Sequence, residues 1–428
     1  MINTVILMAT VLSNGTFITL FQENRAFVLA ELNLKLEKGI NAIEVKEIPR
    51  EIFPGSVELF SPAKGVRISS SRILYDLGPE NLLKKYIGET ILLRREKGEE
   101  EPFTLESFDN QYIYLRCREG SLMPLKLSDF DRLHFPPKEG LVTTPTLMLE
   151  VESKRAKSTN AYLSYMTGGF SWDAMYTSML DGNSMKFNGY AVIQNNTSVD
   201  FKNCVISLFA GEAHLVQAPP PERVMLAAKS VEYGGAQKVG GDFYLYKLEG
   251  KRDIPAFSEV KTSFLERTFE VSREYRFDSR YWGSDRVKLI VHFRNESDDP
   301  IPPGVLSMYV PGAKGRPVFV GESSLEVLPP RAKAELVYGY ASDIKVDRKV
   351  KSRERISKNE HRETIEVKIT NGKKEDIKVN VYEHPYGMWE IIEHNYPFEK
   401  VDANTVKFEL PVKGKGTATL VYTVRYRY

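Results

Sequence analysis

A tryptophan and an aspartate that follow a Gly-Gly turn are the side chains of this sequence best suited to chemistry. Trp172 and Asp173 come shortly after Gly168-Gly169. A tryptophan face can stack on a sugar ring, and a desolvated carboxyl can act as the acid in glycoside hydrolysis. That reaction needs a second carboxylate at a defined distance, and the spacing of Asp181 and Asp200 does not fix one. We therefore interpret Trp172 as a core residue and Asp173 as a turn or edge residue, with glycoside chemistry as the alternative.

The histidines offer a second arrangement with chemical meaning. Only His384 and His394 fall in one expected domain, and each directly follows a glutamate, Glu383 or Glu393. A cation site with two histidines and two glutamates across a hairpin is conceivable from this spacing. Neighbouring residues of a strand face opposite sides, so each histidine would point away from the adjacent glutamate. We expect no metal, no cofactor and no catalytic residue, and we retain His384 and His394 only as surface candidates.

Other motifs with a known mechanism are absent from the sequence. The segment GGAQKVGG at 234–241 lacks the GK[ST] ending of a phosphate loop. Asp242, Glu249 and Asp253 lack the spacing of a calcium loop. No G-x-S-x-G nucleophile elbow occurs, although a triad assembled in space does not need one.

Cysteines and asparagines add two minor expectations. Cys117 and Cys204 match no metal-ligand spacing, and two buried free thiols are favoured over one disulfide. Glycosylation sequons occur at four asparagines, to which we give little weight: Asn14, Asn195, Asn196 and Asn295.

The elements that must position these residues are β-strands. Alternating apolar and polar segments dominate the chain, and almost every one ends in Gly, Pro, Asn or Asp, which is typical of antiparallel strands joined by tight turns. The clearest helix is expected at about 79–86, with Pro79 in its first turn and Gly88 after its end. Five short strands at 87–135 predict a small SH3-like barrel, and the rhythm of 351–428 predicts an immunoglobulin-like sandwich.

The positions of Gly- and Pro-rich turns and linkers predict four domains in a mainly β, multidomain protein. We expect an N-terminal β domain at 1–80 and a short helix with the small barrel at 81–137. A central β domain follows at 138–350, and a C-terminal sandwich follows at 351–428. Within the central domain, 216–242 contains three consecutive prolines and two Gly-Gly pairs, so it predicts a mobile loop.

Composition limits the classes of function. The 428 residues carry 59 Lys and Arg against 57 Asp and Glu, so the net charge of +2 provides no field that would favour nucleic acid. No apolar run is long enough for a transmembrane helix. Residues 1–14 fit either a short signal segment or a first β-strand. The many ion-pairable residues would suit a thermophile.

Several segments resemble a known family. YLSYMTGGFSWDAMY at 162–176 and FYLYKLEGKRDIP at 243–255, together with EHPYGMWEIIEHNYPFEK at 383–400, are similar to a family of uncharacterised bacterial and archaeal proteins. That family shares its C-terminal domain of unknown function with mucoidy-inhibitor-type proteins. The resemblance implies the branch without a coiled coil, because a short helix and the small barrel stand in that position. It also implies an extracytoplasmic location, whether periplasmic, cell-surface or secreted, and it implies no activity.

The leading hypothesis is therefore a non-enzymatic binding or assembly protein of the cell envelope or exterior. Its partner would be a protein or a second copy of the chain, with a glycan as another ligand class, and assembly would use exchange of the N-terminal strand. The alternative is a polysaccharide hydrolase that uses carboxylates of the central β domain. A third hypothesis is peptide binding by exposed aromatic residues of the barrel at 87–135.

Overall fold

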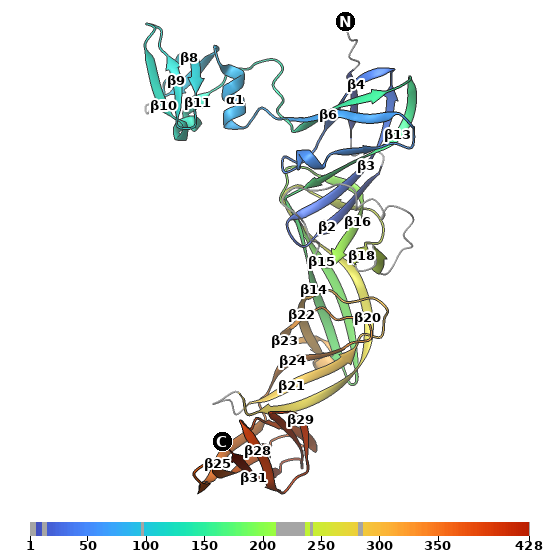
Figure 1. The fold of residues 1–428 in the computed structure, drawn as a ribbon, viewed down its shortest axis with the longest axis vertical. Helices are drawn as coiled ribbons and strands as arrows, with labels where there is room; N and C mark the ends of the chain where they lie inside the picture. The colour runs from blue at the N-terminus through green and yellow to red at the C-terminus, as the bar shows by residue number, and fades with distance from the viewer. Residues whose placement is uncertain are drawn as a thin grey trace. The chain divides into compact units, whose positions relative to one another are not determined.

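The computed structural model describes residues 6–10, 15–95, 98–210, 236–239, 243–280 and 286–427. The chain is mainly β and consists of several largely antiparallel sheets, which confirms the predicted fold class (Figure 1). It divides into two compact units, one of Met1–Trp172 with Ile193–Val260 and one of Asp173–Val192 with Lys261–Tyr428. The segment 138–350, expected to form one central domain, contributes strands to both units.

Unit 1 contains the N-terminal strands and a group of strands from 146–254. Two sheets have the orders β1-β4-β12-β6 and β17-β18-β16-β2-β3-β13-β5, with β19 paired to β16. Their strands are β1 Ile6–Thr10, β2 Thr16–Phe21, β3 Arg25–Leu36, β4 Gly39–Lys46, β5 Glu58–Phe60, β6 Val66–Leu74, β12 Thr146–Ser153, β13 Lys157–Thr167, β16 Phe201–Ala210, β17 Ala236–Val239, β18 Phe243–Lys247 and β19 Arg252–Ile254, with a 3₁₀ turn at Pro54–Ser56.

The N-terminal segment includes an ordered strand. β1 pairs in parallel with β4, from Ile6 opposite Ala42 to Thr10 opposite Lys46, and it forms one edge of its sheet. The strand interpretation of this segment is therefore confirmed for Ile6–Thr10. Residues 1–5 and 11–14 lie outside the described residues.

The loop expected at 216–242 needs a correction. Its residues 216–235 and 240–242 lie outside the described residues. Ala236–Val239, however, forms β17 and pairs antiparallel with β18. Four residues between two Gly-Gly pairs are too few for the alternation of apolar and polar residues to indicate a strand. Its pairing partner supplies the hydrogen bonds that local sequence cannot show.

A small separate sheet with one helix occupies 79–134 (Figure 1). The helix begins and ends as expected, because Pro79 fits its first turn. Buried Leu83 and Tyr86 of this helix share one hydrophobic core with Ile113 and Leu115 of the sheet. The sheet has the order β10-β9-β8-β7-β11, and its SH3-like character stays a prediction. The elements are α1 Pro79–Tyr86, β7 Thr90–Arg94, β8 Glu100–Phe108, β9 Tyr112–Arg116, β10 Leu122–Lys126, β11 Leu133–His134 and a 3₁₀ segment at Leu127–Arg132.

Unit 2 contains the longest strands. The larger sheet has the order β23-β22-β14-β15-β20-β27-β30-β29, and β21 joins β20 to β24, while the second sheet has the order β25-β26-β31-β28. The strands are β14 Phe170–Asp181, β15 Ser184–Asn195, β20 Ser258–Asp278, β21 Val287–Arg294, β22 Gly304–Pro311, β23 Pro317–Leu325, β24 Lys333–Ala341, β25 Ile344–Ser357, β26 Glu360–Asn371, β27 Ile377–Glu383, β28 Met388–His394, β29 Phe398–Asp402, β30 Thr405–Val412 and β31 Thr417–Arg427, with a 3₁₀ turn at Ala313–Gly315.

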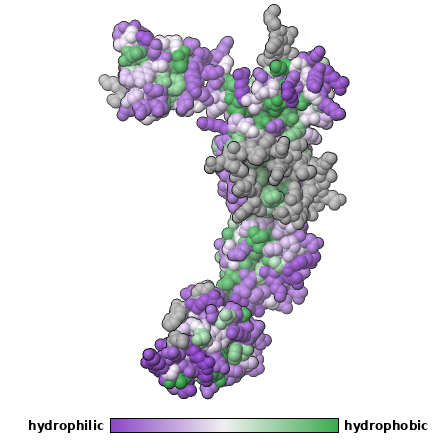
Figure 2. Space-filling model, in the orientation of Figure 1, coloured by the Kyte–Doolittle hydropathy of each residue, from purple (hydrophilic) through white to green (hydrophobic). Residues whose placement is uncertain are grey.

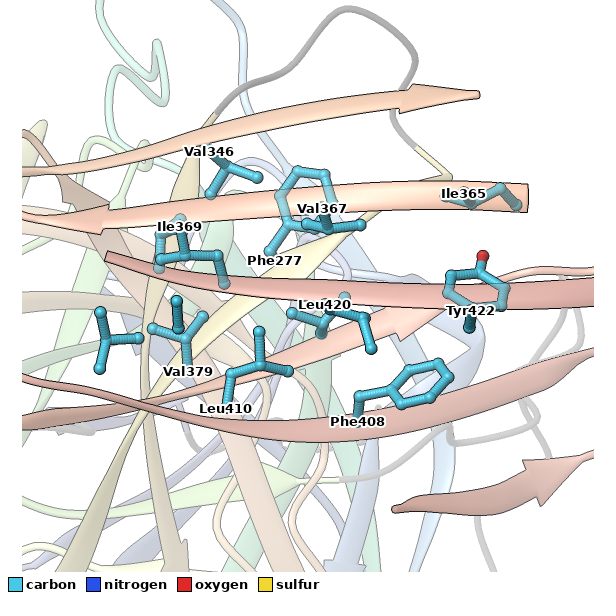
Figure 3. Packing of buried hydrophobic residues seen from close by; sticks show 14 of the residues in the cluster. Phe277, Val346, Ile365, Val367, Ile369, Val379, Phe408, Leu410, Leu420 and Tyr422 are labelled. Atoms are coloured by element: carbon cyan, nitrogen blue, oxygen red, sulfur yellow. The ribbon is translucent and has the colours of Figure 1, made fainter. Parts of the chain in front are cut away.

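The C-terminal part of unit 2 is a sandwich with an aliphatic core. Val367 and Leu420 from one sheet meet Phe408 and Leu410 from the other, and all four are fully buried (Figure 3). Phe277 of β20 also belongs to this core, although it lies well before the expected domain boundary at 351. The packed sandwich agrees with the strand rhythm, and its immunoglobulin-like character stays a prediction.

A buried asparagine closes the strand turn at three places in the chain. The Nδ2 of Asn195 lies 3.0 Å from the carbonyl oxygen of Val199, four residues on, and 3.3 and 2.9 Å from those of Ile254 and Pro255. Its Oδ1 accepts a hydrogen bond from the backbone N–H of Thr197. One side chain therefore satisfies the backbone of its own turn and of a distant strand end.

The same geometry recurs at Asn295 and Asn371 in unit 2. Asn295 donates to the carbonyl of Asp299 and to two consecutive carbonyls at 328–329, and Asn371 donates to Glu375 and to two at 412–413. Each Oδ1 again accepts from the N–H two residues on. All three asparagines are buried, so in the folded chain the sequons at Asn195 and Asn295 carry structural amides rather than glycan sites.

We expect Asn371→Ala to destabilise unit 2 by about 3 kcal/mol, because buried or partly buried carbonyls would lose their donor. Asn371→Asp should cost more, since a carboxylate would face those carbonyl oxygens. Thermal unfolding followed by circular dichroism measures both effects. Asn359→Ala, at an exposed turn of the same unit, is the control and should change little. Equal melting temperatures for all three variants would contradict the assigned role.

Candidate interaction surface

Trp172 and Asp173 do not form a sugar platform. Trp172 is fully buried, and its indole Nε1 donates to the carbonyl oxygen of Phe209 at 3.3 Å. Asp173, the next residue of β14, is exposed on the opposite side of the strand. A buried ring offers no face to a sugar, so the core interpretation of Trp172 agrees with its position.

His384 and His394 lie on strands of different sheets. His384 Nε2 is 2.8 Å from Asp278 Oδ1, and its Nδ1 is 3.2 Å from the hydroxyl of Thr405. His394 Nδ1 is 2.9 Å from the carbonyl oxygen of Tyr396. The structure does not bring these imidazoles together. Within the described parts of the chain, no group of three or more His, Cys, Asp or Glu side chains is placed to hold a metal ion.

Both cysteines are free thiols. Cys204 is buried, and this burial raises the pKa of its thiol to about 12. Because the thiolate is the nucleophilic form, Cys204 is inert near neutral pH. Cys117 is only partly buried, which differs from the expectation of two buried thiols.

One charge network in unit 2 surrounds Glu274 on β20. The guanidinium of Arg276 donates to both carboxylate oxygens of Glu274 at 2.8 and 2.7 Å, and His292 Nε2 lies 2.6 Å from Oε2. Asn380 of β27 adds a hydrogen bond at 3.0 Å, and Arg276 also binds Glu335 of β24. Three strands, β20, β21 and β27, therefore supply the partners of this carboxylate, and β24 joins the network through Arg276.

These partners control the charge of Glu274. Burial by itself would raise the pKa of this carboxyl, but hydrogen bonds from His292, Arg276 and Asn380 outweigh it and hold the pKa well below its usual range. Glu274 is therefore ionised throughout the neutral range. It acts as a permanent anion that joins β20 to its neighbours rather than as a proton donor.

A second network lies inside the C-terminal sandwich. Glu383 is almost fully buried and accepts hydrogen bonds from Arg348 Nε and Nη2 and from the hydroxyl of Tyr422 at 2.8 Å. Burial and then the charge of Glu383 raise the pKa of Tyr422 well above its usual value. The charge of Glu383 is matched by Arg348 and its oxygens are hydrogen-bonded, as a buried ion pair requires.

The feature of unit 2 best suited to contact another molecule is an apolar row on the outer face of β14, β22 and β23. We call it the outer row: Met175, Val305, Tyr309 and Phe319. Met175 and Val305 are cross-strand neighbours, and the rings of Tyr309 and Phe319 meet edge to face with centroids 5.7 Å apart. Met175, Val305 and Phe319 keep 39%, 43% and 54% of their surface exposed.

Close backbone packing creates the outer row. β22 pairs in parallel with β14, and a Cβ on Gly304 would lie 2.1 Å from the carbonyl oxygen of Ala174. Only glycine permits this approach. Between the two apolar pairs, Ser307 donates a hydrogen bond to Glu322 at 2.9 Å. The surface seen in Figure 2 is mostly hydrophilic, with hydrophobic residues gathered in small patches.

The fold and these features define a multi-sheet β protein whose described buried carboxylates belong to charge-matched networks. Residues 161–428 match the family model of a domain of unknown function, DUF4139, and the chain belongs to this family. No curated protein matches the sequence. Among the described residues, no helix is long and apolar enough to span a membrane.

Sequence reasoning missed the outer row and both charge networks. Met175 and Val305 are far apart in the sequence, and their parallel pairing leaves no local signal. The alternation of SREYRF at 272–277 does place Glu274 and Arg276 on one face of a strand. That signal could have identified the pair but not its partners on three other strands.

Acid should destabilise unit 2 through Glu274. Its folded pKa is depressed below the unfolded value of about 4.3, so its contribution is present above about pH 4.3 and is lost as the pH falls towards the folded value. Glu274→Gln should lower stability at pH 7 by about 3 kcal/mol, because Arg276 and His292 lose their anion. It should also reduce the further loss between pH 5 and pH 2.

Chemical denaturation at several pH values measures both effects. Glu326→Gln, an exposed carboxylate of the same unit, is the matched control and should follow the wild type. A Glu274→Gln protein with wild-type stability at pH 7 would show that the network contributes nothing.

Proposed function

We propose that this protein is a non-enzymatic binding or assembly protein of the cell envelope or exterior. The observation that carries the proposal is the outer row, whose residues Met175, Val305 and Phe319 are exposed on a single face. Met175 and Val305 are direct neighbours, and one cross-strand pair separates them from Phe319. Exposed apolar residues gathered on one face of a sheet mark interaction sites. Burying them against a partner recovers hydrophobic free energy that the isolated chain does not gain.

The chemistry of the outer row points to a protein partner. The carboxylate between its two pairs, Glu322, accepts a hydrogen bond from Ser307, and none of the four residues of the row is a lysine or arginine. An anionic lipid surface or a nucleic acid would need cations there. An apolar protein surface with a rigid aromatic contact fits Tyr309 and Phe319, because aromatic residues dominate the centres of protein interfaces.

The networks around Glu274 and Glu383 support a structural rather than catalytic use of buried charge. Each carboxylate is ion-paired and hydrogen-bonded, Glu274 by groups of its own sheet and Glu383 by Arg348 and Tyr422 of the second sheet. A general acid needs a pKa near the working pH, whereas Glu274 has its pKa held far below that range. The proposal of a non-enzymatic role rests on this contrast.

The resemblance to mucoidy-inhibitor-type proteins supports the extracytoplasmic location. Under this proposal the chain represents the branch without a coiled coil, and the small sheet at 79–134 stands where the other branch has its helices. The density of surface ion pairs, such as Arg95 with Glu101 and Arg362 with Glu354, suits the proposed thermophilic origin.

Assembly of several copies would use β1. It is an edge strand, and it pairs with β4, a strand far along the chain, rather than with the next strand. Exchange of an identical edge strand between copies keeps every contact it makes in one copy. The proposed assembly therefore needs no new interface at β4.

Substitution of the outer row should remove the protein partner. We expect Val305→Asp and Phe319→Asp each to weaken partner binding by about tenfold or more, since a charge would be buried on binding. Tagged wild-type and variant proteins, purified from the native cell, are compared by the proteins that accompany them. Val327→Asp is the control, because Val327 is comparably exposed but lies outside the row. Partners that stay with both row variants would overturn the proposal.

Removal of residues 1–14 tests strand exchange separately. If copies exchange β1, the full chain should elute as a multiple of its mass in size-exclusion chromatography, and the shortened chain should elute as a monomer. Circular dichroism checks that the remaining sheets are intact. A full chain that is monomeric, or a shortened chain that assembles equally well, contradicts strand exchange. Either result leaves the proposal for the outer row unaffected.

A further inference from the structure

The strand end that Asn195 holds presents one phenylalanine to solvent. Phe257 lies in the turn directly before β20 and keeps 74% of its surface exposed. This is the highest value for a large apolar side chain in the part of the chain that the structure describes. Its backbone also has a φ of +49°, in the left-handed region that a bulky residue rarely adopts. Phe257 is therefore both exposed and conformationally unfavourable.

The other two asparagine turns provide a direct comparison. Arg331 and Lys415 occupy the same place as Phe257, two residues after the second carbonyl that the asparagine binds, and they have φ of +62° and +55°. The backbone N–H of each of the three residues donates to a carbonyl oxygen of the facing asparagine turn. The left-handed conformation therefore belongs to the turn, whichever side chain the turn carries.

The side chains at these three positions differ in what they contact. The guanidinium of Arg331 donates to Asp298 Oδ1 at 2.8 Å, and the ammonium of Lys415 donates to the carbonyl oxygen of Gly372. Both cations therefore hydrogen-bond to the asparagine turn that faces them. A benzyl group has no donor, so the ring of Phe257 cannot bind its turn in this way. Burial against another molecule would recover hydrophobic free energy from this ring.

Hydrogen bonds fix the backbone that presents Phe257. Its N–H donates to the carbonyl oxygen of Thr197 at 3.2 Å, and the N–H of the residue before it donates to Asp200 Oδ1 at 2.8 Å. On the other side of the ring, the hydroxyl of Ser258 donates to the carbonyl oxygen of Pro255 at 2.7 Å. A side chain on a backbone held in this way loses little backbone freedom on binding, which favours affinity.

The charges around Phe257 cancel one another. The backbone hydrogen bond from Ala256 lowers the pKa of Asp200, so this carboxylate is ionised at neutral pH, and it lies 3.5 Å from the ammonium of Lys202. Within five positions of Phe257 along the chain, two cations stand against two carboxylates: Arg252, Lys261, Asp253 and Glu259. The surroundings of the ring therefore have no net charge.

This balance identifies the class of partner. An anionic membrane surface or a nucleic acid needs an excess of cations beside the contact. One benzyl group also buries much less apolar surface than a single acyl chain, which is itself a marginal membrane anchor. An apolar pocket on a protein needs no charge, and a single rigidly presented aromatic side chain is the usual anchor for such a pocket.

We propose that Phe257 is an anchor residue that inserts its ring into an apolar pocket of a protein partner. The contact lies in unit 1, whereas the outer row belongs to unit 2, and neither proposal depends on the other. The pocket would accept one benzyl group, and its rim would meet both charges of the pair formed by Asp200 and Lys202. An unfavourable backbone conformation is then retained for binding rather than for stability.

The melting temperature separates this role from a structural one. Phe257→Asn replaces the ring with a residue that adopts positive φ readily. We expect the full-chain variant to melt at or above the wild-type temperature when unfolding is followed by circular dichroism, because an exposed ring contributes little packing. A clearly lower melting temperature would show that the ring holds its turn together, and it would overturn the proposal.

Photo-crosslinking tests the class of partner. The full chain carrying Phe257→p-benzoylphenylalanine is incubated with an extract of the native cell and irradiated. We expect an adduct with one protein. The same probe in place of Lys415, an exposed residue with the same turn geometry, is the matched control and should not give this adduct. An adduct with lipid alone, or no protein adduct specific to position 257, overturns the proposal.

The affinity for the crosslinked protein, once it is purified, gives the decisive result. Titration calorimetry should show that Phe257→Asn weakens binding by about tenfold or more, as the loss of an aromatic anchor does. Phe257→Leu keeps an apolar side chain and should lose less. Lys415→Asn makes the same replacement in the equivalent turn and should bind like the wild type. Equal affinities for the wild type and Phe257→Asn would overturn the proposal and leave the outer row unaffected.

Discussion

Satisfaction of backbone carbonyls at the ends of buried strands is the constraint on which this structure depends. Where a strand leaves its sheet, its last carbonyl groups lose their ladder partners while remaining inside the protein, and each unpaired group is costly. Asn195, Asn295 and Asn371 solve this problem in one way. Each amide binds the carbonyl four residues on and two carbonyls of another strand end.

The recurrence of that geometry has a consequence for the whole DUF4139 region. Each asparagine ties a local turn to a strand end contributed from elsewhere in the chain, 254–255, 328–329 or 412–413. The turns therefore determine which distant strand ends can lie beside them. Each of the three turns is thereby joined by hydrogen bonds to a strand end that is distant in the sequence.

Charge has a corresponding structural use. Glu274 and Glu383 are held by arginines from their own or other strands, and tyrosine or histidine completes each group. An ion pair buried in this way contributes specificity of strand arrangement more than net stability, since desolvation offsets much of the attraction. The outer row differs from these networks because its apolar side chains remain in water, where a partner can cover them.

The strand pattern and the turn residues were enough to predict many of the elements of the fold. They fail where an element is too short to show a pattern. The helix at Pro79–Tyr86 and the five strands of the small sheet follow from periodicity, proline and glycine alone. The burial of Trp172 agrees with its place in an alternating strand. β17 was not predicted, because four residues between two Gly-Gly pairs are too few to show an alternation of apolar and polar residues.

The sequence by itself determined that the chain is mainly β, because alternation and turn chemistry are local and act within a few residues. Only the tertiary structure decided which strands become neighbours. The outer row exists because β14 lies beside β22, and the Glu274 network exists because β20, β21, β24 and β27 meet. Such pairings depend on backbone hydrogen bonds and close packing at positions such as Gly304, which no local pattern encodes.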